Sequence, residues 1–311
     1  MDVYYGERTC AGIKKDGSGC NNKAYYLFNG IYVCGVHSKK DSRVELSKNP
    51  DKGANKLKDI EEMKAAYLSS QRTNQLNKRK GHVMCTKMSM MKEVNHTEGY
   101  LSVYPNKKHG NRKDGLGLPA LSPMNLGPID SKQPNLPISH NLENFWYASK
   151  LFPSQILCKK ESHDDCDGKC FRKYQIEMFT NSEAERHNKH SKENGKKVFP
   201  LGWLWTESNG TTKLFKYVES RQFYCNYYER LVKKEDQFKK LINLMNDGMN
   251  LNIIGYDGIN LNITLDDVKE HLNACYLDGS KPFGHELCLM TMLVFEDEED
   301  YPWRKHKTEN F

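Results

Sequence analysis

Residues 141–150 read NLENFWYASK and carry the pattern on which the interpretation of this chain depends. Glu143, Tyr147 and Lys150 are spaced i, i+4 and i+7. In a helix, this spacing places a carboxylate, a phenol and an ammonium group on one face. The stretch therefore predicts a helix over 141–152 with a polar stripe, which is either a solvated surface or one wall of a binding site.

The flanking sequence defines the ends of this helix and its packing face. Asn141 is suited to cap the first turn, and Pro153 ends the helix because proline lacks an amide hydrogen. The expected packing face consists of Leu142, Phe145, Ser149 and Phe152. The preceding loop, residues 121–140, contains four prolines and several apolar residues, so we expect it to wall a pocket whose floor is the polar helix face.

Composition limits the class of protein. The chain has 311 residues, of which 37% are hydrophobic, and its mean hydropathy is −0.80, so we expect a modest core with some solvated linker. It contains no apolar run long enough for a membrane span, and its N-terminus lacks the apolar core of a signal peptide. Ten cysteines without a secretory signal favour reduced thiols and metal sites. We therefore expect a cytoplasmic or nuclear protein without membrane contact.

Basic charge is concentrated in the N-terminal third. The chain has a net charge of +7, and residues 38–115 hold 18 Lys and Arg against 9 Asp and Glu. Such a concentration favours a polyanionic partner such as DNA or RNA, because bound phosphates release counterions. A lysine-rich, solvated linker explains the same charge equally well.

We predict an α+β fold with a predominantly helical main domain and a small N-terminal zinc-binding module. The segments are a Cys/His module at 1–37, a basic and partly helical tether at 38–98, a main domain at 99–295 with an insertion loop at 158–197, and an acidic to polar tail at 296–311. In the main domain, the patterns predict strands at 99–105 and 250–257 and helices at 219–232, 235–246, 264–272 and 284–295.

The N-terminal module carries a metal-ligand pattern. Cys10, Cys20, Cys34 and His37 have the spacing C-x9-C-x13-C-x2-H, and three thiolates with one imidazole suit a structural zinc ion. A segment of this size cannot bury enough apolar surface to fold alone, and a bound metal supplies the missing stability. We therefore predict structural zinc as the cofactor of this module.

A second group of potential ligands lies in the loop CKKESHDDCDGKC. Cys158, His163, Cys166 and Cys170 could close another zinc site that staples the insertion. Unpaired loop thiols beside a histidine that binds no metal are an equally good interpretation.

Further candidates lie at the boundaries of expected elements, where ligand-binding groups tend to sit on a rigid scaffold. Arg112 and Arg221 are cations at such boundaries, and Asp257 follows a buried strand. His285 and Glu286 come at a helix N-terminus, where backbone N–H groups favour anions. An N-terminal glutamate is also simply a favourable helix-start residue, so the pattern alone leaves the role of Glu286 open.

The segment NLENFWYASKLF resembles the central helix of the NADAR family, proteins tied to NAD and ADP-ribose chemistry. The matching residues are Glu143, Phe145, Trp146, Ala148 and Lys150, while Tyr147 stands where the family usually has glutamine. The resemblance covers residues 121–152 and, more loosely, 276–295. The combination of a short Cys/His module with this segment is also similar to uncharacterised proteins of large DNA viruses, which implies a viral factory or a virion as a further possible location.

The resemblance implies an N-glycosidase-like hydrolase that acts on an ADP-ribosyl or ribosyl–base compound. Its ligand would be an ADP-ribose-like small molecule or ADP-ribosylated nucleic acid. Glu143 would be the catalytic carboxylate, with Asp257 or Glu286 as its partner, because cleavage through an oxocarbenium-like state needs a carboxylate and often an acid. The expected substrate-binding residues are Arg112, Lys150 and Arg221 for a diphosphate, Trp146 or Tyr147 for stacking on a base, and His285.

The alternative is a non-enzymatic zinc- and nucleic-acid-binding viral protein. In that case the module and the basic tether carry the function, and the main domain is a folded platform with a solvated helix face. An enzyme should bring Glu143, Lys150, Arg221 and Asp257 together in one pocket, and this criterion separates the two interpretations.

Overall fold

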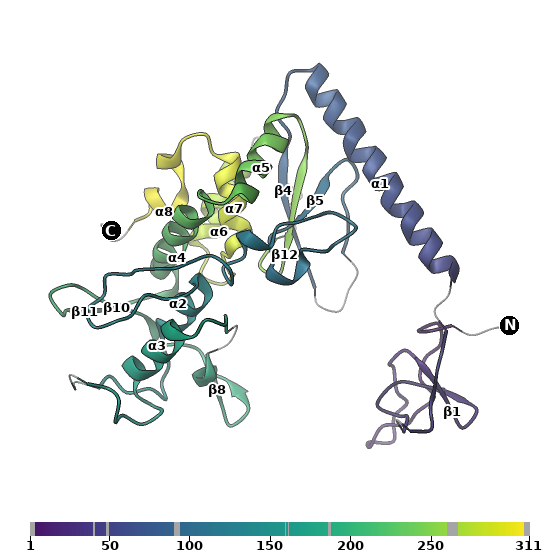
Figure 1. The fold of residues 1–311 in the computed structure, drawn as a ribbon, viewed down its shortest axis with the longest axis horizontal. Coiled ribbons are helices and arrows are strands. Elements are labelled where there is room, and N and C mark those ends of the chain that lie inside the picture. The colour runs from purple at the N-terminus through teal and green to yellow at the C-terminus, as the bar shows by residue number, and fades with distance from the viewer. Residues whose placement is uncertain are drawn as a thin grey trace. The chain divides into compact units, whose positions relative to one another are not determined.

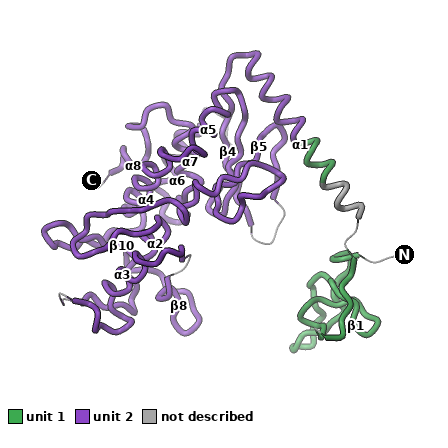
Figure 2. The backbone as a smooth tube through the Cα atoms, in the orientation of Figure 1, with its two compact units in different colours: residues 1–63 green, residues 64–311 purple. Residues whose placement is uncertain are grey.

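The computed structural model describes residues 4–39, 41–47, 50–89, 94–158, 160, 162–185, 188–259 and 267–307. The chain divides into two compact units, residues 1–63 and residues 64–311, which are coloured separately in Figure 2. Each unit is described by itself below.

The first unit is a small antiparallel sheet with a core built from cysteines. Its strands are β1 (Tyr26–Phe28), β2 (Ile31–Val33) and β3 (Val44–Glu45), in the order β2-β1-β3. The buried core cluster consists of Cys10, Cys20, Val33 and Cys34, with Tyr26 and Phe28 packed against it. So few apolar side chains cannot offset the conformational entropy lost on folding.

A long helix, α1 (Pro50–Leu76), follows the small sheet and continues into the second unit. The other helices, all in the second unit, include α2 (Leu142–Ala148), α3 (Phe171–Thr180), α4 (Tyr217–Val232), α5 (Asp236–Asn246), α6 (Val268–Leu277), α7 (His285–Val294) and α8 (Pro302–Lys305). Strands of this unit are β4 (Val83–Lys87), β5 (Leu101–Tyr104), β6 (Leu116–Gly117), β7 (Lys150–Leu151), β8 (Lys192–Glu193), β9 (Lys196–Lys197), β10 (Gly202–Thr206), β11 (Thr212–Phe215) and β12 (Leu251–Gly255).

The second unit contains a parallel sheet of four strands among its described residues. Its order is β4-β12-β5-β6, and every neighbouring pair is parallel. All five residues of β12 are buried, as the apolar run at 250–257 predicts. Strand β4 lies within the segment that we expected to be a tether, yet it pairs with β12 along its whole length. A tether over 38–98 therefore does not describe residues 83–87, and the pairing partner that makes them a strand lies far away in sequence.

A helical layer covers this sheet (Figure 1). Helix α7 contacts both β4 and β12, and α4 and α6 contact α7 in turn. Residues 285–293 of α7 are all buried, which agrees with the all-round apolar pattern of that segment. The expected short helix at 264–272 corresponds to α6, although residues 260–266 lie outside the described part of the chain.

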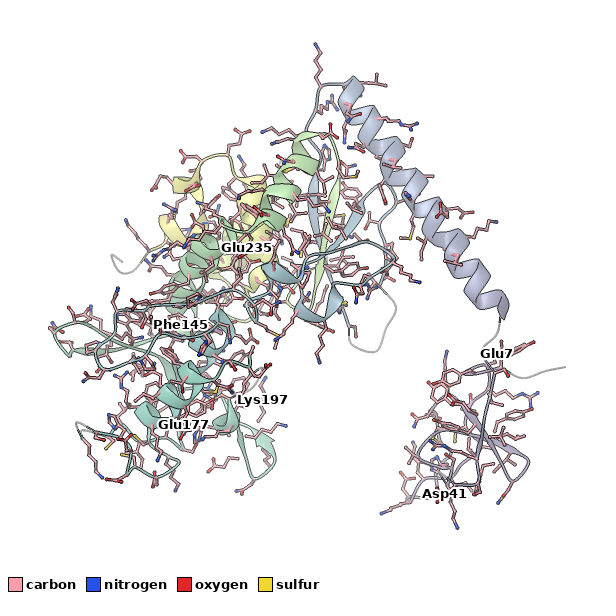
Figure 3. The ribbon with its side chains drawn as sticks, in the orientation of Figure 1. Glu7, Asp41, Phe145, Glu177, Lys197 and Glu235 are labelled. Atoms are coloured by element: carbon pink, nitrogen blue, oxygen red, sulfur yellow. The ribbon has the colours of Figure 1, made fainter. Side chains whose placement is uncertain are left out.

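Helix α2 is shorter than its sequence pattern predicts. It ends at Ala148, with Ser149 as its C-cap, and Lys150 and Leu151 form strand β7. The backbone leaves the helix because β7 pairs with β10, where the amide of Leu204 donates to the carbonyl of Ser149 over 2.7 Å. The expected packing face is nevertheless buried, and Phe145, labelled in Figure 3, is fully enclosed.

Among its described residues, the second unit combines helices with the parallel sheet, an antiparallel sheet of order β11-β10-β7 and the antiparallel pair β8-β9, so a predominantly helical domain is not confirmed. The expected insertion loop contains α3, which packs against α2. The expected tail contains α8, whose Trp303 is fully buried and donates from Nε1 to Glu229 over 2.8 Å. Among the described residues, no helix has both the length and the apolarity of a membrane span.

Candidate active site and metal clusters

A pocket of about 350 Å³ lies in the second unit and collects most of the candidate residues of the main domain. Its lining includes the catalytic candidates Glu143, Asp257 and Glu286 and the binding candidates Trp146, Tyr147, Arg221 and His285. Ser122, Pro123 and Met124 also line it, so the proline-rich loop does wall a pocket. Neither Lys150 nor Arg112 belongs to the lining of this pocket in the described structure.

The three carboxylates come from three different elements. Glu143 lies in the first turn of α2, Asp257 follows the end of the parallel strand β12, and Glu286 lies in the first turn of α7. The end of β12 faces the start of α7 because α7 packs directly on this strand. Residues more than one hundred positions apart in sequence thereby reach the same cavity.

Two glycines let Asp257 and Glu286 approach the backbone closely. A Cβ atom at Gly255 would lie 1.8 Å from Oε1 of Glu286, and one at Gly284 would lie 2.6 Å from Oδ2 of Asp257. The contacts are reciprocal: Gly255, in the segment of Asp257, contacts Glu286, and Gly284, in the segment of Glu286, contacts Asp257. Any larger residue at Gly255 would displace Glu286, which is only 1% exposed.

His285 and Glu286 lie within ion-pair distance of each other. Nε2 of His285 lies 3.1 Å from the carbonyl oxygen of Pro105, which can only accept, so Nε2 carries a hydrogen. Nδ1 of the same ring lies 3.2 Å from Oε2 of Glu286. A ring that donates from Nε2 carries a hydrogen on Nδ1 as well only when it is the imidazolium.

Burial raises the pKa of Asp257, and the neighbouring carboxylate of Glu286 raises it further. His285, Lys87 and Lys150 oppose this shift with their positive charge. Two carboxyl groups that disfavour each other's ionisation in a pocket are typical of acid–base sites.

Lys150 lies beside the pocket although it is not on the helix. Its Nζ is 4.1 Å from the ring centroid of Tyr147 and 4.9 Å from that of Trp146. Burial lowers the pKa of Lys150 to about 8, while the charges of Glu143 and Asp257 work against that decrease. Lys150 is therefore electrostatically coupled to two of the candidate carboxylates, although it lies in β7 and not on the helical stripe that the sequence predicts.

The lowered pKa of Lys150 predicts a distinct pH dependence of stability. Folded Lys150 releases its proton near pH 8, whereas the usual value is 10.5, so between these values the unfolded chain binds one more proton. The free energy of unfolding of the native chain, relative to Lys150→Met, should therefore rise by about 1 kcal/mol per pH unit over this range. Urea unfolding of both proteins measures it, and a difference that stays flat with pH contradicts the assignment.

Arg221 lines the pocket, but its guanidinium group is mostly occupied by backbone carbonyls. Nη1 donates to the carbonyls of Cys275, at 3.1 Å, and Tyr276, and Nη2 donates to those of Asp278, at 3.0 Å, and Lys281. Only Nε has no partner among the described residues. Arg221 thus holds the end of α6 and the following loop, which differs from the expected role as a diphosphate ligand.

Arg112 is placed away from the expected site. Its Nε donates to Asp114 over 2.7 Å, and its guanidinium carbon lies 4.1 Å from the ring centroid of Tyr104. The carboxylate of Asp114 raises the pKa of Arg112, so the charge is retained but already paired. The sequence could not reveal this ion pair. Asp114 lies two residues after Arg112 in a polar stretch, where neighbouring charges are common and need not contact each other.

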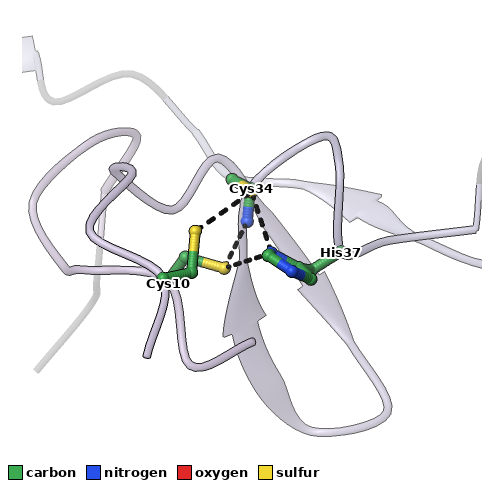
Figure 4. Close-up of side chains that lie close together, drawn as sticks. Cys10, Cys34 and His37 are labelled. Atoms are coloured by element: carbon green, nitrogen blue, oxygen red, sulfur yellow. Dashed lines mark hydrogen bonds between the residues drawn. The ribbon is translucent and has the colours of Figure 1, made fainter. Parts of the chain in front are cut away.

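The first metal cluster is preformed (Figure 4). Sγ of Cys10 and Sγ of Cys34 each lie 3.4 Å from Nδ1 of His37, and Sγ of Cys20 lies 3.9 Å from Sγ of Cys34. A zinc tetrahedron with Zn–S of about 2.3 Å and Zn–N of about 2.0 Å has S···S edges of about 3.8 Å and S···N edges of about 3.5 Å. The four side chains thus fit a metal ion, as the sequence predicts.

Electrostatics around Cys34 favour its thiolate. Burial opposes ionisation, but hydrogen bonds from the backbone amides of His37 and Val36 outweigh it and lower the pKa of Cys34 to about 6. Gly12 packs against the His37 ring, since a Cβ atom there would lie 2.3 Å from Cγ of the imidazole. The ring is therefore held in place by the backbone of the opposite loop.

The second cluster also brings its four side chains together. Cys158, His163, Cys166 and Cys170 place one ligand atom each within 4.8 Å of the other three. This arrangement favours the metal-site interpretation of the loop over unpaired thiols.

Several pocket residues were not among the candidates from sequence. Asn106, Tyr217, Tyr256 and Phe283 line the cavity, and Nδ2 of Asn106 is buried without a partner in the described part of the chain. Each of them lies within a few residues of an element boundary, but none carries a residue pattern that separates it from an ordinary loop position.

The resemblance to the NADAR family stays a prediction that no comparison supports. The chain matches no protein-family model, no curated protein and no solved structure.

Proposed function

We propose that the second unit is an N-glycosidase-like hydrolase that cleaves the bond between a base and the ribose of an ADP-ribosyl or ribosyl compound. The observation that carries the proposal is the meeting of Glu143, Asp257 and Glu286 in one pocket whose walls include Trp146 and Tyr147. Carboxylates stabilise an oxocarbenium-like transition state, and aromatic rings offer stacking surfaces for a base.

The roles follow from the surroundings of each carboxylate. Glu143 interacts electrostatically with Lys150, and we assign it as the carboxylate that stabilises the ribosyl cation or activates water. Glu286 lies within ion-pair distance of His285, and we assign this pair as the proton donor for the departing base. Asp257 is electrostatically coupled to both of these groups, because Glu286 raises its pKa and Lys150 lowers it.

Substrate binding is assigned more narrowly than the sequence suggests. Of the three cations expected to bind a diphosphate, Lys150 is the one left for a phosphate group, because Arg112 is paired with Asp114 and Arg221 with four carbonyls. Trp146 packs against Tyr224 with ring centroids 5.1 Å apart, which fixes its indole ring for stacking. Nδ2 of Asn106 is a further donor at the pocket.

The direct assay uses purified full-length protein with ADP-ribosylated guanine nucleotide or ADP-ribosylated DNA. Liquid chromatography should detect ADP-ribose that accumulates with time. No release from these substrates, combined with unchanged ADP-ribose binding in Glu143→Gln, would rule out the proposed activity.

The two carboxylate roles predict a dependence on the leaving group. A riboside with an activated leaving group such as 4-nitrophenolate needs no proton, so Glu286→Gln should lose activity on it by less than about tenfold. The same variant should lose about 10²–10⁴-fold on a riboside with a poor leaving group. Equal losses on both substrates would show that Glu286 is not the acid.

We also propose that the metal of the first cluster is zinc with a purely structural role. Three thiolates and one imidazole form a closed ligand set, which leaves no open position for a substrate. Metal analysis of the purified protein tests the identity of the ion.

A second candidate function, polyanion binding by the first unit, rests on the exposure of Lys14, Lys15, Lys23 and Lys39 around that cluster. Changing Lys14, Lys15 and Lys23 to glutamate should weaken binding to DNA or RNA and flatten its salt dependence. The matched control changes the exposed Lys192, Lys196 and Lys197 of the β8–β9 hairpin. Equal effects of both triple variants would contradict a role for the module.

A further inference from the structure

The cluster of Cys158, His163, Cys166 and Cys170, defined here as the staple cluster, has the dimensions of a zinc site. Sγ of Cys166 lies 3.6 Å from Sγ of Cys158 and 3.9 Å from Nδ1 of His163. Sγ of Cys170 lies 3.5 Å from the same nitrogen. These separations bracket the edges of about 3.5–3.8 Å expected for a tetrahedral Cys₃His zinc site.

Hydrogen bonds, and not apolar packing, hold the described part of the loop that carries the staple cluster. Ile156 and Leu157 are 56% and 51% exposed, so apolar burial does not fix the entrance of the loop. Nζ of Lys173 donates to the carbonyls of Asp164, at 2.7 Å, and Cys166, at 2.9 Å, which ties the loop to the first turn of α3. A bound metal supplies the stability that this exposed segment lacks.

The staple cluster is joined directly to helix α3. Cys170 is the N-cap residue of α3, and its backbone forms an isolated parallel β-bridge with Ile156. The next residue, Phe171, is 1% exposed and belongs to a small apolar cluster with Leu151 and Leu204. A metal held by Cys170 would therefore fix the start of α3 against strands β7 and β10.

Helix α3 in turn supports the helix that carries Glu143. Phe179 of α3 packs against Phe145 of α2, with ring centroids 5.8 Å apart. Nε2 of Gln175 in α3 donates to Oγ of Ser149, the C-cap of α2, over 3.4 Å. Ser149 is followed directly by Lys150 in the sequence. The path from the staple cluster to the pocket wall is thus continuous through packed side chains.

We propose that the staple cluster binds a zinc ion that holds α3 against α2 and β7, and thereby positions Glu143 and Lys150. This metal does not touch the pocket; it acts on the pocket through the packing of α3. The inference does not depend on the reaction, because it concerns the rigidity of α2 and β7.

Metal content provides the first test. The native chain should hold two zinc ions, and Cys34→Ser and Cys166→Ser should each hold one. His163→Cys keeps a fourth ligand and should still hold two. One zinc ion in the native chain, or two in Cys166→Ser, would overturn the assignment.

Hydrogen exchange of the backbone amides provides the second test, with no substrate needed. Amides of residues 142–151 should exchange at least about tenfold faster in Cys166→Ser than in the native chain, because they lose the support of α3. Cys34→Ser is the matched control and should change them by less than about twofold. Unchanged exchange in a Cys166→Ser protein that has lost one zinc ion would refute the coupling.

If Cys166→Ser does not fold, the native chain can be used instead. Hydrogen exchange is then measured while a chelator removes the zinc ions stepwise. Faster exchange of residues 142–151 upon loss of the second zinc ion supports the proposal, and unchanged exchange contradicts it. Neither result depends on glycosidase activity, so a failure of the proposed function and a failure of this inference are distinguishable.

Discussion

Glu143→Gln is expected to slow the release of ADP-ribose by about 10²–10⁴-fold. The glutamine has nearly the same shape, but it cannot carry the negative charge that stabilises the ribosyl cation or takes a proton from water. The variant should fold normally, because Glu143 is only half-buried in the first turn of α2. Initial rates over a range of substrate concentrations measure the loss.

The distribution of the loss between kcat and KM is informative. A carboxylate that acts in the transition state should change kcat, whereas one that only binds the ribose hydroxyls should change KM. Glu193→Gln in the exposed strand β8 is the matched control and should retain full activity. If Glu143→Gln retains activity within a few fold, Glu143 is not the catalytic carboxylate.

Removal of metal from the N-terminal unit is expected to unfold it. Its buried core is three cysteines and one valine, and structural zinc contributes about 10–16 kcal/mol of apparent binding free energy in modules of this kind. Cys34→Ser should therefore abolish the amide protection of β1 and β2 in hydrogen exchange.

The second unit provides the internal reference for this experiment. The fully buried strand β12 should keep its protection in Cys34→Ser, because it belongs to a separate core. If β1 and β2 retain native protection in the metal-free variant, the unit is stable without an ion and the metal has no structural role.

The sequence predicts the local parts of this structure well. Strand β12 and helices α4, α5 and α7 follow from apolar runs and helical periodicity, which reflect burial of each segment by itself. The two Cys/His groups could be found because ligand spacing directly encodes the chemistry of the site. Asp257 and Glu286 are candidates from sequence because the first follows a buried strand and the second lies in the first turn of a buried helix.

Contacts between distant segments could not be predicted in the same way. Lys150 fits the helical pattern, but its backbone pairs with β10, a partner fifty residues later. Strand β4 looks like part of a polar tether until β12 pairs with it. From the sequence, Arg221 appears to be an unpaired cation. In the structure its guanidinium group donates hydrogen bonds to carbonyls more than fifty residues away. Each difference arises from pairing that no local pattern encodes.

The most direct test of the proposed site is a crystal structure of Glu143→Gln with an uncleaved ADP-ribosylated nucleoside. We expect the ribose to occupy the pocket, with its anomeric carbon beside residue 143 and the base toward His285 and Glu286. A substrate bound elsewhere on the protein, or a ribose whose anomeric carbon faces away from all three carboxylates, would contradict it.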